Sequence, residues 1–240
     1  MNKYIDMHCH ILPEVDDGAA DLKEMRKMLK IAYKEGVRCI IATPHFHPYR
    51  GHASRKRLNE QLRLVRQEAK KIDEDFRVFL GNEIYFGHDI PDRLQKKKVL
   101  TMNNREYVLV EFSVSDSADH IKQGIQLIQA RGYKVILAHI ERYECFYNDY
   151  DAVENLYEMG VLIQVNAQSI IKERNPKAKK LMRFLLENEL VFCVGTDAHG
   201  VRKRPPRLKK AARYVSKKYG ERYARRIFFS NAMQMLKKQR

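Results

Sequence analysis

The segment Tyr4-Ile5-Asp6-Met7-His8-Cys9-His10 is a short apolar run that ends in two histidines. Side chains alternate between the two faces of a strand, so His8 and His10 point the same way. Further runs of this kind follow, and most are apolar throughout, as parallel strands buried on both faces are. We predict strands at Lys3–Met7, Val37–Thr43, Arg77–Asn82, Tyr107–Phe112, Lys134–Ala138, Val161–Asn166 and Val191–Gly195.

Longer amphipathic segments separate these runs and predict helices. Between Asp21 and Lys34 the apolar residues recur at helical spacing, and Gly36 follows as a stop signal. We predict similar helices at Arg57–Ile72, Ala118–Arg131, Tyr150–Met159 and Lys177–Asn188. Repeated strand–helix units of this number favour an α/β fold that closes as a distorted, TIM-like (β/α)7 barrel. An open doubly wound sheet is the alternative, but no G-x-G-x-x-G turn follows the first strand.

The composition is typical of one globular domain over residues 1–240. Hydrophobic residues make up 44% of the chain and charged residues 32%, which is enough apolar material for a sizeable core. No apolar stretch approaches the roughly 20 residues that span a bilayer, and the N-terminus has no signal-peptide pattern. The four cysteines form no C-x-x-C pair. We therefore expect a cytoplasmic protein with reduced thiols.

The positive charge is concentrated near the C-terminus. Residues 202–240 contain 15 Lys and Arg and one acidic residue, Glu221, so this basic C-terminal segment carries +14 of the formal net charge of +16. Its apolar residues recur at helical spacing, which predicts amphipathic helices that cover the barrel with solvated basic faces. The same charge would also dock an acidic partner, anionic lipid or nucleic acid. The sequence leaves both interpretations open.

Side chains that bind metals follow nearly every predicted strand, at the edge where barrel active sites form. They are His8, His10, His45, Glu83, Glu111, His139, Asp197 and His199. Converging imidazoles and carboxylates would repel one another or titrate unless cations were bound, and a mixed His/carboxylate set suits zinc, manganese or iron. We predict a metal site there. The remaining histidines, His47, His52, His88 and His120, are interpreted as structural or solvated.

A cysteine nucleophile is not expected. In the C-x5-R motif of nucleophilic cysteines an arginine follows the cysteine by six residues, and none of the four cysteines here has one. Cys9 lies between two predicted ligands and is interpreted as a packing residue.

In combination, these motifs resemble the polymerase-and-histidinol-phosphatase (PHP) superfamily. The motifs are Asp6-x-His8-x-His10, Asp16-Asp17-Gly18, Thr43-Pro44-His45, Glu83, Glu111-Phe112, Ala138-His139-x-Glu141-Arg142 and Asp197-x-His199. Within the superfamily, His8-Cys9-His10-Ile11-Leu12-Pro13 and His139-Ile140-Glu141-Arg142-Tyr143 are similar to the manganese-dependent bacterial protein-tyrosine phosphatases of capsule and exopolysaccharide operons, the CpsB/YwqE type. The resemblance covers essentially the whole chain.

The resemblance implies up to three divalent metals, with manganese expected and iron, cobalt or zinc as alternatives. One site would use His8, His10 and Asp197, with Glu83 bridging to a second site completed by Glu111 and His139. A third would use Asp17, His45 and His199, with Asp17 preferred to Asp16 because it adjoins Gly18. The two arginines that clamp phosphate in the family match Arg142 and Arg204, with Arg202 as the alternative to Arg204.

The expected activity is metal-dependent hydrolysis of a phosphomonoester by a protein-tyrosine phosphatase. A bound metal lowers the pKa of water from about 15.7 towards about 7, which supplies hydroxide to attack phosphorus. The implied partner is the phosphotyrosine tail of a membrane-linked bacterial tyrosine kinase that regulates polysaccharide export, with inorganic phosphate as product. The alternatives are a PHP phosphoesterase acting on a small phosphate such as histidinol phosphate, and a nuclease module. The chain lacks the interleaved aromatics and Gly-rich loops that suit single-stranded nucleic acid, so nucleic acid is not the expected partner.

Overall fold

A computed structural model describes residues 3–237, so the last three residues of the basic C-terminal segment lie outside the described residues. The strands are β1 (Tyr4–Cys9), β2 (Val37–Ala42), β3 (His45–Phe46), β4 (Arg77–Leu80), β5 (Glu83–Tyr85), β6 (Tyr107–Glu111), β7 (Lys134–Leu137), β8 (Leu162–Asn166) and β9 (Val191–Gly195). The α-helices are α1 (Leu22–Lys34), α2 (Arg55–Lys70), α3 (Ile90–Gln95), α4 (Ala118–Gln129), α5 (Tyr150–Glu158), α6 (Ala167–Lys172), α7 (Pro176–Glu187), α8 (Lys209–Tyr219), α9 (Glu221–Arg225) and α10 (Asn231–Leu236). Short 3-10 turns lie at η1 (Met102–Asn104), η2 (Ile140–Arg142) and η3 (Glu144–Phe146), and one π-helical turn at η4 (Arg226–Ser230).

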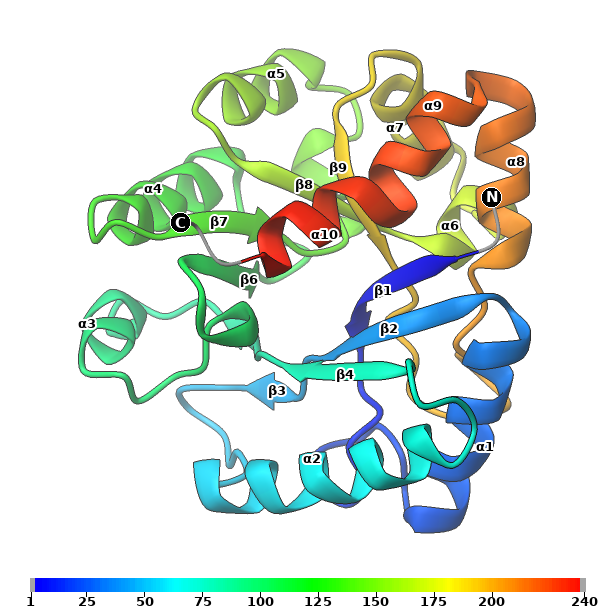
Figure 1. Ribbon diagram of the computed structural model, residues 1–240. Coiled ribbons are helices and arrows are strands. Elements are labelled where there is room, and N and C mark those ends of the chain that lie inside the picture. The colour runs from blue at the N-terminus through cyan, green and yellow to red at the C-terminus, as the bar shows by residue number, and fades with distance from the viewer. Residues whose placement is uncertain (1–2, 238–240) are drawn as a thin grey trace.

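The strands form a distorted barrel in which every strand pair is parallel, as Figure 1 shows. One sheet has the order β1-β2-β4, and the other β3-β5-β6-β7-β8-β9. The two sheets meet next to β9, where the Asp197 N–H donates to the His8 carbonyl over 2.7 Å and the His10 N–H donates to the Ala198 carbonyl over 3.0 Å. The expected α/β barrel is therefore confirmed.

Two short strands, β3 and β5, follow predicted strands and were not predicted themselves. The strand predicted at Val37–Thr43 ends at Ala42, and β3 begins only after Thr43-Pro44, because proline has no N–H to donate to a ladder. The strand predicted at Arg77–Asn82 ends at Leu80, and β5 begins after the break at Gly81-Asn82. The Asn82 side chain takes up backbone groups at this break: it donates to the Pro44 carbonyl and accepts from the Leu100 N–H. These breaks place His45 and Glu83 at the starts of new short strands.

The predicted helices form within two residues of the expected limits, and side chains cap several of them. Asp21 accepts from the Glu24 N–H at the start of α1, and Ser117 accepts from the His120 N–H at the start of α4. The short helices α3 and α6 were not predicted. No helix among residues 3–237 is long and apolar enough to cross a membrane.

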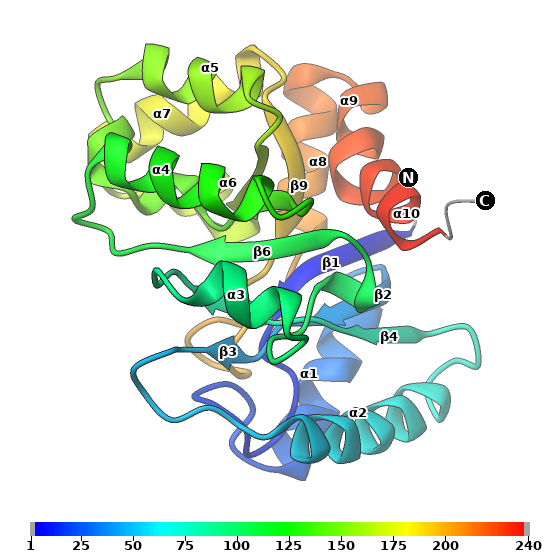
Figure 2. The same cartoon turned by 90° about the vertical axis from the view of Figure 1, so that its left-hand side faces the viewer.

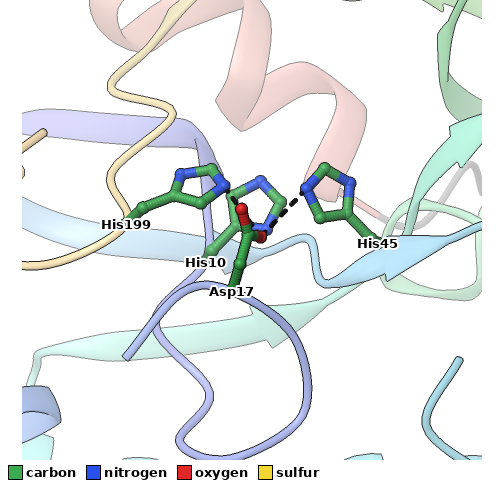
Figure 3. Close-up of side chains that lie close together, drawn as sticks. All are labelled: His10, Asp17, His45 and His199. Atoms are coloured by element: carbon green, nitrogen blue, oxygen red, sulfur yellow. Dashed lines mark ion pairs between the residues drawn. The ribbon is translucent and has the colours of Figure 1, made fainter. Parts of the chain in front are cut away.

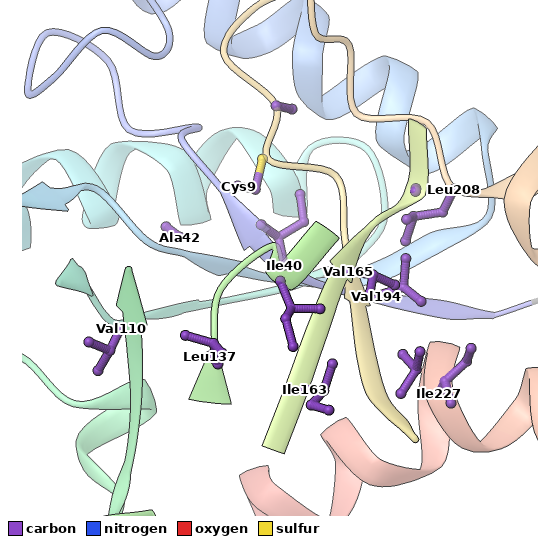
Figure 4. Packing of buried hydrophobic residues seen from close by; sticks show 14 of the residues in the cluster. Cys9, Ile40, Ala42, Val110, Leu137, Ile163, Val165, Val194, Leu208 and Ile227 are labelled. Carbon is purple, nitrogen blue, oxygen red and sulfur yellow. The ribbon is translucent and has the colours of Figure 1, made fainter. Parts of the chain in front are cut away.

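Two apolar layers hold the barrel together. The outer layer lies between strands and helices and includes Ile40, Val110 and Val165, as Figure 4 shows. The inner layer lies inside the barrel and is made by alternate strand residues such as Met7, Leu109 and Ile136. Because apolar side chains fill both layers, the polar side chains that could bind a metal or substrate lie at the ends of the strands.

The basic C-terminal segment covers the barrel with helices. Ala211, Ala212 and Val215 of α8 are buried, as the helical spacing predicts. Ala232 and Met235 of α10 join the inner apolar layer, and α10 lies beside β1 in Figures 1 and 2. The covering interpretation of this segment is therefore confirmed for its apolar face.

Candidate metal centre

The predicted ligands converge at the carboxyl ends of the strands. Their donor atoms form three overlapping groups, each with all its atoms within 4.8 Å of one another. The groups are His8, His10, Glu83 and Asp197; His45, Glu83 and Glu111; and His10, Asp17, His45 and His199. His139 lies against the first two groups. All nine predicted ligands thus lie in one cluster, although their roles as ligands stay predictions.

The first group is fully buried. The Nε2 atoms of His8 and His10 lie 3.2 Å apart, so both rings direct the same nitrogen towards one point. Glu83 faces them, with Oε1 3.2 Å from His8 Nε2 and Oε2 3.2 Å from His10 Nε2. Asp197 Oδ1 lies 3.6 Å and 3.5 Å from the same two nitrogens. The members of this group are those that the resemblance assigns to the first site and its bridge.

The second group differs from the expected set in one member. His45 Nδ1 lies 3.0 Å from Glu83 Oε2 and 3.6 Å from Glu111 Oε1, so His45 occupies the place that the resemblance gives to His139. His139 Nε2 nevertheless lies 2.9 Å from Glu83 and 3.5 Å from Glu111. Both imidazoles therefore contact the same two carboxylates, and each imidazole contacts a different oxygen of each carboxylate.

The third group lies nearest the solvent. Asp17 Oδ1 lies 3.3 Å from the Nε2 atoms of His45 and of His199. Figure 3 shows the Asp17 carboxylate between these two imidazoles. The neighbouring Asp16 has a different place: its Oδ2 lies 2.8 Å from His10 Nδ1, and it accepts the His45 N–H. Asp16 thus orients an imidazole from behind, in the manner of residues that support metal ligands. The two acids therefore have different contacts. Asp17 lies with His45 and His199, the set that the resemblance implies, and Asp16 lies behind His10.

The imidazoles and carboxylates of the cluster shift one another's pKa values in opposite directions. Burial alone would lower the pKa of His10, but its contacts with Asp16 and Glu83 outweigh burial and raise the pKa to about 9. For His139, burial and the nearby Arg142 lower the pKa, and Glu111 and Glu83 together raise it to about 9. Burial would raise the pKa of Glu83, yet the surrounding imidazoles hold it well below its ordinary value. Carboxylates that stay ionised among imidazoles form a donor set that suits a divalent cation.

Several polar atoms in the cluster also lack hydrogen bonds. Among the described residues, Glu83 Oε2, His139 Nδ1 and His199 Nε2 are buried and make no hydrogen bond of good geometry, although Glu83 Oε2 and His199 Nε2 keep the ion-pair contacts given above. A buried polar atom without a hydrogen bond costs about 1–3 kcal/mol. Two residues of the cluster adopt a rare backbone conformation, since φ is 34° at His139 and 50° at Asp197. The donor types, their directions and these unsatisfied atoms all fit divalent metals.

Both predicted arginines contact the cluster at the same carboxylate oxygen of Asp197. Arg142 and Arg204 each donate a hydrogen bond to Asp197 Oδ2, over 3.0 Å in the case of Arg204. Both side chains are about one third exposed, so they extend from the ligands towards solvent. Arg202 is exposed and makes no hydrogen bond or ion pair that the described residues record. The geometry therefore favours Arg204 over Arg202.

Strand β8 carries two supporting residues that the sequence analysis missed. The Gln164 side-chain oxygen lies 3.3 Å from His8 Nδ1 and accepts the His139 N–H over 2.8 Å. The Asn166 amide donates to Asp197 Oδ2 over 3.2 Å. Both residues are buried and stand two apart in an otherwise apolar strand. That alternation was the available signal, because buried polar residues need partners.

The cysteines lie outside this chemistry. Cys9, Cys39 and Cys193 are buried, and burial raises the pKa of each thiol, to about 12 for Cys39. A thiol with so high a pKa is a poor nucleophile at neutral pH.

Comparison with known proteins gives consistent matches over nearly the whole chain. The family model for "Capsular polysaccharide synthesis, CpsB/CapC" matches residues 4–237. The chain is 34% identical to tyrosine-protein phosphatase CpsB of Streptococcus pneumoniae over 237 residues, 97% of this chain and 98% of that one. It is 30% identical to tyrosine-protein phosphatase YwqE of Bacillus subtilis over 218 residues, 90% and 85% of the two chains.

A solved structure gives the same result. It comes from a study of YwqE from Bacillus subtilis and CpsB from Streptococcus pneumoniae, described as unique metal-dependent tyrosine phosphatases. It superposes with a TM-score of 0.87 at 30% identity and covers 97% of this chain and 94% of that chain. The strand-end ligand pattern and the barrel thus have a common explanation: this chain belongs to the CpsB/CapC family of capsular polysaccharide synthesis.

Proposed function

We propose that this protein is a metal-dependent phosphatase that hydrolyses phosphotyrosine in a protein. The observation that carries the proposal is the convergence of nine imidazole and carboxylate side chains with two arginines at the mouth of one barrel. The named activities of the relatives point to the same reaction. Phosphomonoesters are anions that react slowly, so a site with several cations suits them.

The metal ligands in this proposal are His8, His10, Asp17, His45, Glu83, Glu111, His139, Asp197 and His199. Because histidines and carboxylates are mixed, manganese fits, and iron, cobalt and zinc fit as well. Bound metal would supply hydroxide at neutral pH and neutralise phosphoryl oxygens. Asp16 and Gln164 orient His10 and His8 from behind. These supports hold the donor atoms in place before substrate arrives.

Arg142 and Arg204 bind the phosphoryl group in this account. Their guanidinium groups meet at the buried Asp197 Oδ2, while both arginine side chains are about one third exposed. A planar guanidinium offers paired N–H donors to two oxygens of one phosphate, and its charge offsets the charge that develops as the bond to the leaving group breaks. Tyrosine leaves as a phenolate with a pKa near 10, so the reaction needs no strong general acid.

The partner in this account is an acidic, phosphorylated segment of a bacterial tyrosine kinase, and inorganic phosphate is the product. A cavity of about 380 Å³, lined by residues of α6, of α8 and of the loop between β9 and α8, supports an acidic partner. It is lined by Thr196, next to Asp197, and by the cations Lys172, Arg202, Lys203, Arg207 and Lys210, and no acidic residue lines it. We call these five cations the basic groove. A membrane-linked kinase would place the reaction in the cytoplasm, near the membrane surface.

One comparison of substrates tests the proposal. A phosphotyrosine peptide, histidinol phosphate and a single-stranded oligonucleotide would each be incubated with the protein and added manganese. We expect the highest kcat/KM for the phosphotyrosine peptide. Faster hydrolysis of histidinol phosphate would instead establish a small-molecule phosphoesterase, and cleavage of the oligonucleotide would establish a nuclease.

A further inference from the structure

Two aromatic side chains follow the metal-centre residues on neighbouring strands. His47 comes two residues after His45, and Tyr85 comes two residues after Glu83. His45 and Glu83 are partners in the parallel pair of β3 and β5. Because side chains two apart in an extended chain share a face, His47 and Tyr85 extend the same face one step towards solvent. Both are half-buried.

The chain neighbours of these two side chains indicate the same direction. Phe46, before His47, and Phe86, after Tyr85, are buried, and Phe86 stacks on Phe112 with ring centroids 4.8 Å apart. A Cβ atom on Gly124 of α4 would lie within 2.8 Å of Phe86, so that ring packs towards the helix layer. Tyr85 therefore points the opposite way, towards the barrel mouth. Its register partner on β6 is Glu111, whose carboxylate faces His45.

The aromatic side chains form a small ordered cluster. The His47 and Tyr85 rings stack with centroids 4.4 Å apart and planes 11° from parallel. Tyr49 adds a third ring, 6.0 Å from His47 and at 70° to it. The Tyr49 N–H donates to His47 Nδ1 over 3.2 Å, which fixes the imidazole. No hydrogen bond of the Tyr85 hydroxyl is recorded among residues 3–237, so its ring offers an apolar surface.

We propose that His47, Tyr49 and Tyr85 form an aromatic rim that binds the phenol ring of phosphotyrosine. The inference rests on the proposed function. In an aryl phosphate the ester oxygen is bonded directly to the ring, so a phosphoryl group at the arginines brings a ring against the wall of the site. In an alkyl phosphate a flexible methylene stands there instead. Ring-to-ring contact thus favours tyrosine over serine esters. Aromatic pairs contribute about 0.5–1.5 kcal/mol beyond area burial, a factor of about 2–12.

Binding of two phosphonates to the metal-loaded protein tests the rim. Calorimetry would give the Kd of phenylphosphonate and of methylphosphonate for the parent protein and for Tyr85→Ala, Tyr85→Phe and His47→Ala. We expect Tyr85→Ala and His47→Ala to weaken phenylphosphonate about three- to tenfold and to leave methylphosphonate within twofold. Tyr85→Phe keeps the ring and should match the parent. Tyr157→Ala on α5 removes a half-exposed tyrosine elsewhere, and it should match the parent too.

Turnover separates this inference from the proposed function. The kcat/KM for a phosphotyrosine peptide should fall in Tyr85→Ala by the same factor as the phenylphosphonate affinity. The rim is overturned if the parent hydrolyses the peptide but Tyr85→Ala equals it, or if Tyr85→Ala weakens both phosphonates equally. A parent protein that binds methylphosphonate and leaves phosphotyrosine intact would overturn the proposed function instead.

Discussion

At the scale of single residues, Asp197 Oδ2 connects the ligands to the arginines. Arg142 and Arg204 donate to this one oxygen, and Asn166 donates to it as well. Burial would raise the pKa of Asp197, but His8 and Arg142 hold it below its ordinary value, so the carboxylate stays ionised. An ionised carboxylate with three donors is held in one orientation, which keeps both guanidinium groups beside the candidate metals.

Arg142→Ala is expected to lower kcat/KM for a phosphotyrosine peptide by about 10²–10³-fold, because one preorganised charge stabiliser is lost. Arg142→Lys should restore only part of the rate, since an ammonium group lacks the planar pair of donors. Steady-state kinetics would measure both, and elemental analysis should find the metal content unchanged. Parent-like turnover by Arg142→Ala would remove Arg142 from the phosphate clamp.

The sequence predicts which residues approach the site better than it predicts how they group. Each strand-end ligand could be identified because parallel strands bring their carboxyl ends to one edge. The sharing of His10 and His45 between groups depends on ring directions that only the folded chain defines. The roles of Gln164 and Asn166 were missed because the sequence shows two amides alternating in an apolar strand but does not show which groups they contact.

At the scale of secondary-structure elements, the close approach of β9 to β1 positions His8. A Cβ atom built on Gly195 would lie 2.5 Å from His8 Cβ and 3.2 Å from Gln164 Nε2. Only glycine leaves room for the histidine and its supporting amide together. The register of β1 against β2 also shifts between Asp6 and Cys9, as at bulges that redirect side chains near active sites.

Gly195→Ala is therefore expected to displace His8, with a stability cost of about 1–3 kcal/mol from overpacking. The retained manganese per chain should fall together with activity, while the protein stays folded. Elemental analysis and thermal unfolding would measure the two effects. Gly51→Ala is the matched control, since a Cβ atom there meets nothing within 4 Å. Full metal content in Gly195→Ala would show that this contact does not position the ligand.

The elements themselves were largely predictable from apolar periodicity. The long helices and all seven strand runs could be placed because each buries a regular face. The short strands β3 and β5 were missed, because they have only two and three residues, too few for an alternating pattern to emerge. Helices α3 and α6 are six residues each, too short for a helical period to emerge.

At the scale of the whole molecule, the surplus positive charge of the C-terminal segment lines two separate cavities. The apolar face of α8 packs on the barrel, and its cations remain on the outside. Lys210 belongs to the basic groove, whereas Lys218 lines a separate cavity with Lys179, Lys180 and Arg183. Of the two, only the cavity of the basic groove is lined by Thr196, which is next to Asp197. We therefore expect the cations of the basic groove to contact the substrate, and the cations around Lys218 only to add charge to the surface.

The double variant Arg207→Glu/Lys210→Glu is expected to lower kcat/KM for an acidic phosphotyrosine peptide by about three- to tenfold, because steering depends on local charge. Hydrolysis of a small aryl phosphate should change little, and the effect should shrink as salt rises. Lys217→Glu/Lys218→Glu carries the same change of charge away from the groove and should match the parent. Equal losses from both pairs would assign the effect to net charge and would contradict docking in the groove.

The most direct measurement of the central claim is hydrolysis of a phosphotyrosine peptide by protein stripped of metal, before and after manganese is added back. The account predicts that stripping abolishes turnover, that manganese restores it, and that Asp197→Ala stays inactive while folded, because Asp197 joins the candidate ligands to both arginines. Full turnover by protein in which elemental analysis detects no metal would contradict the account.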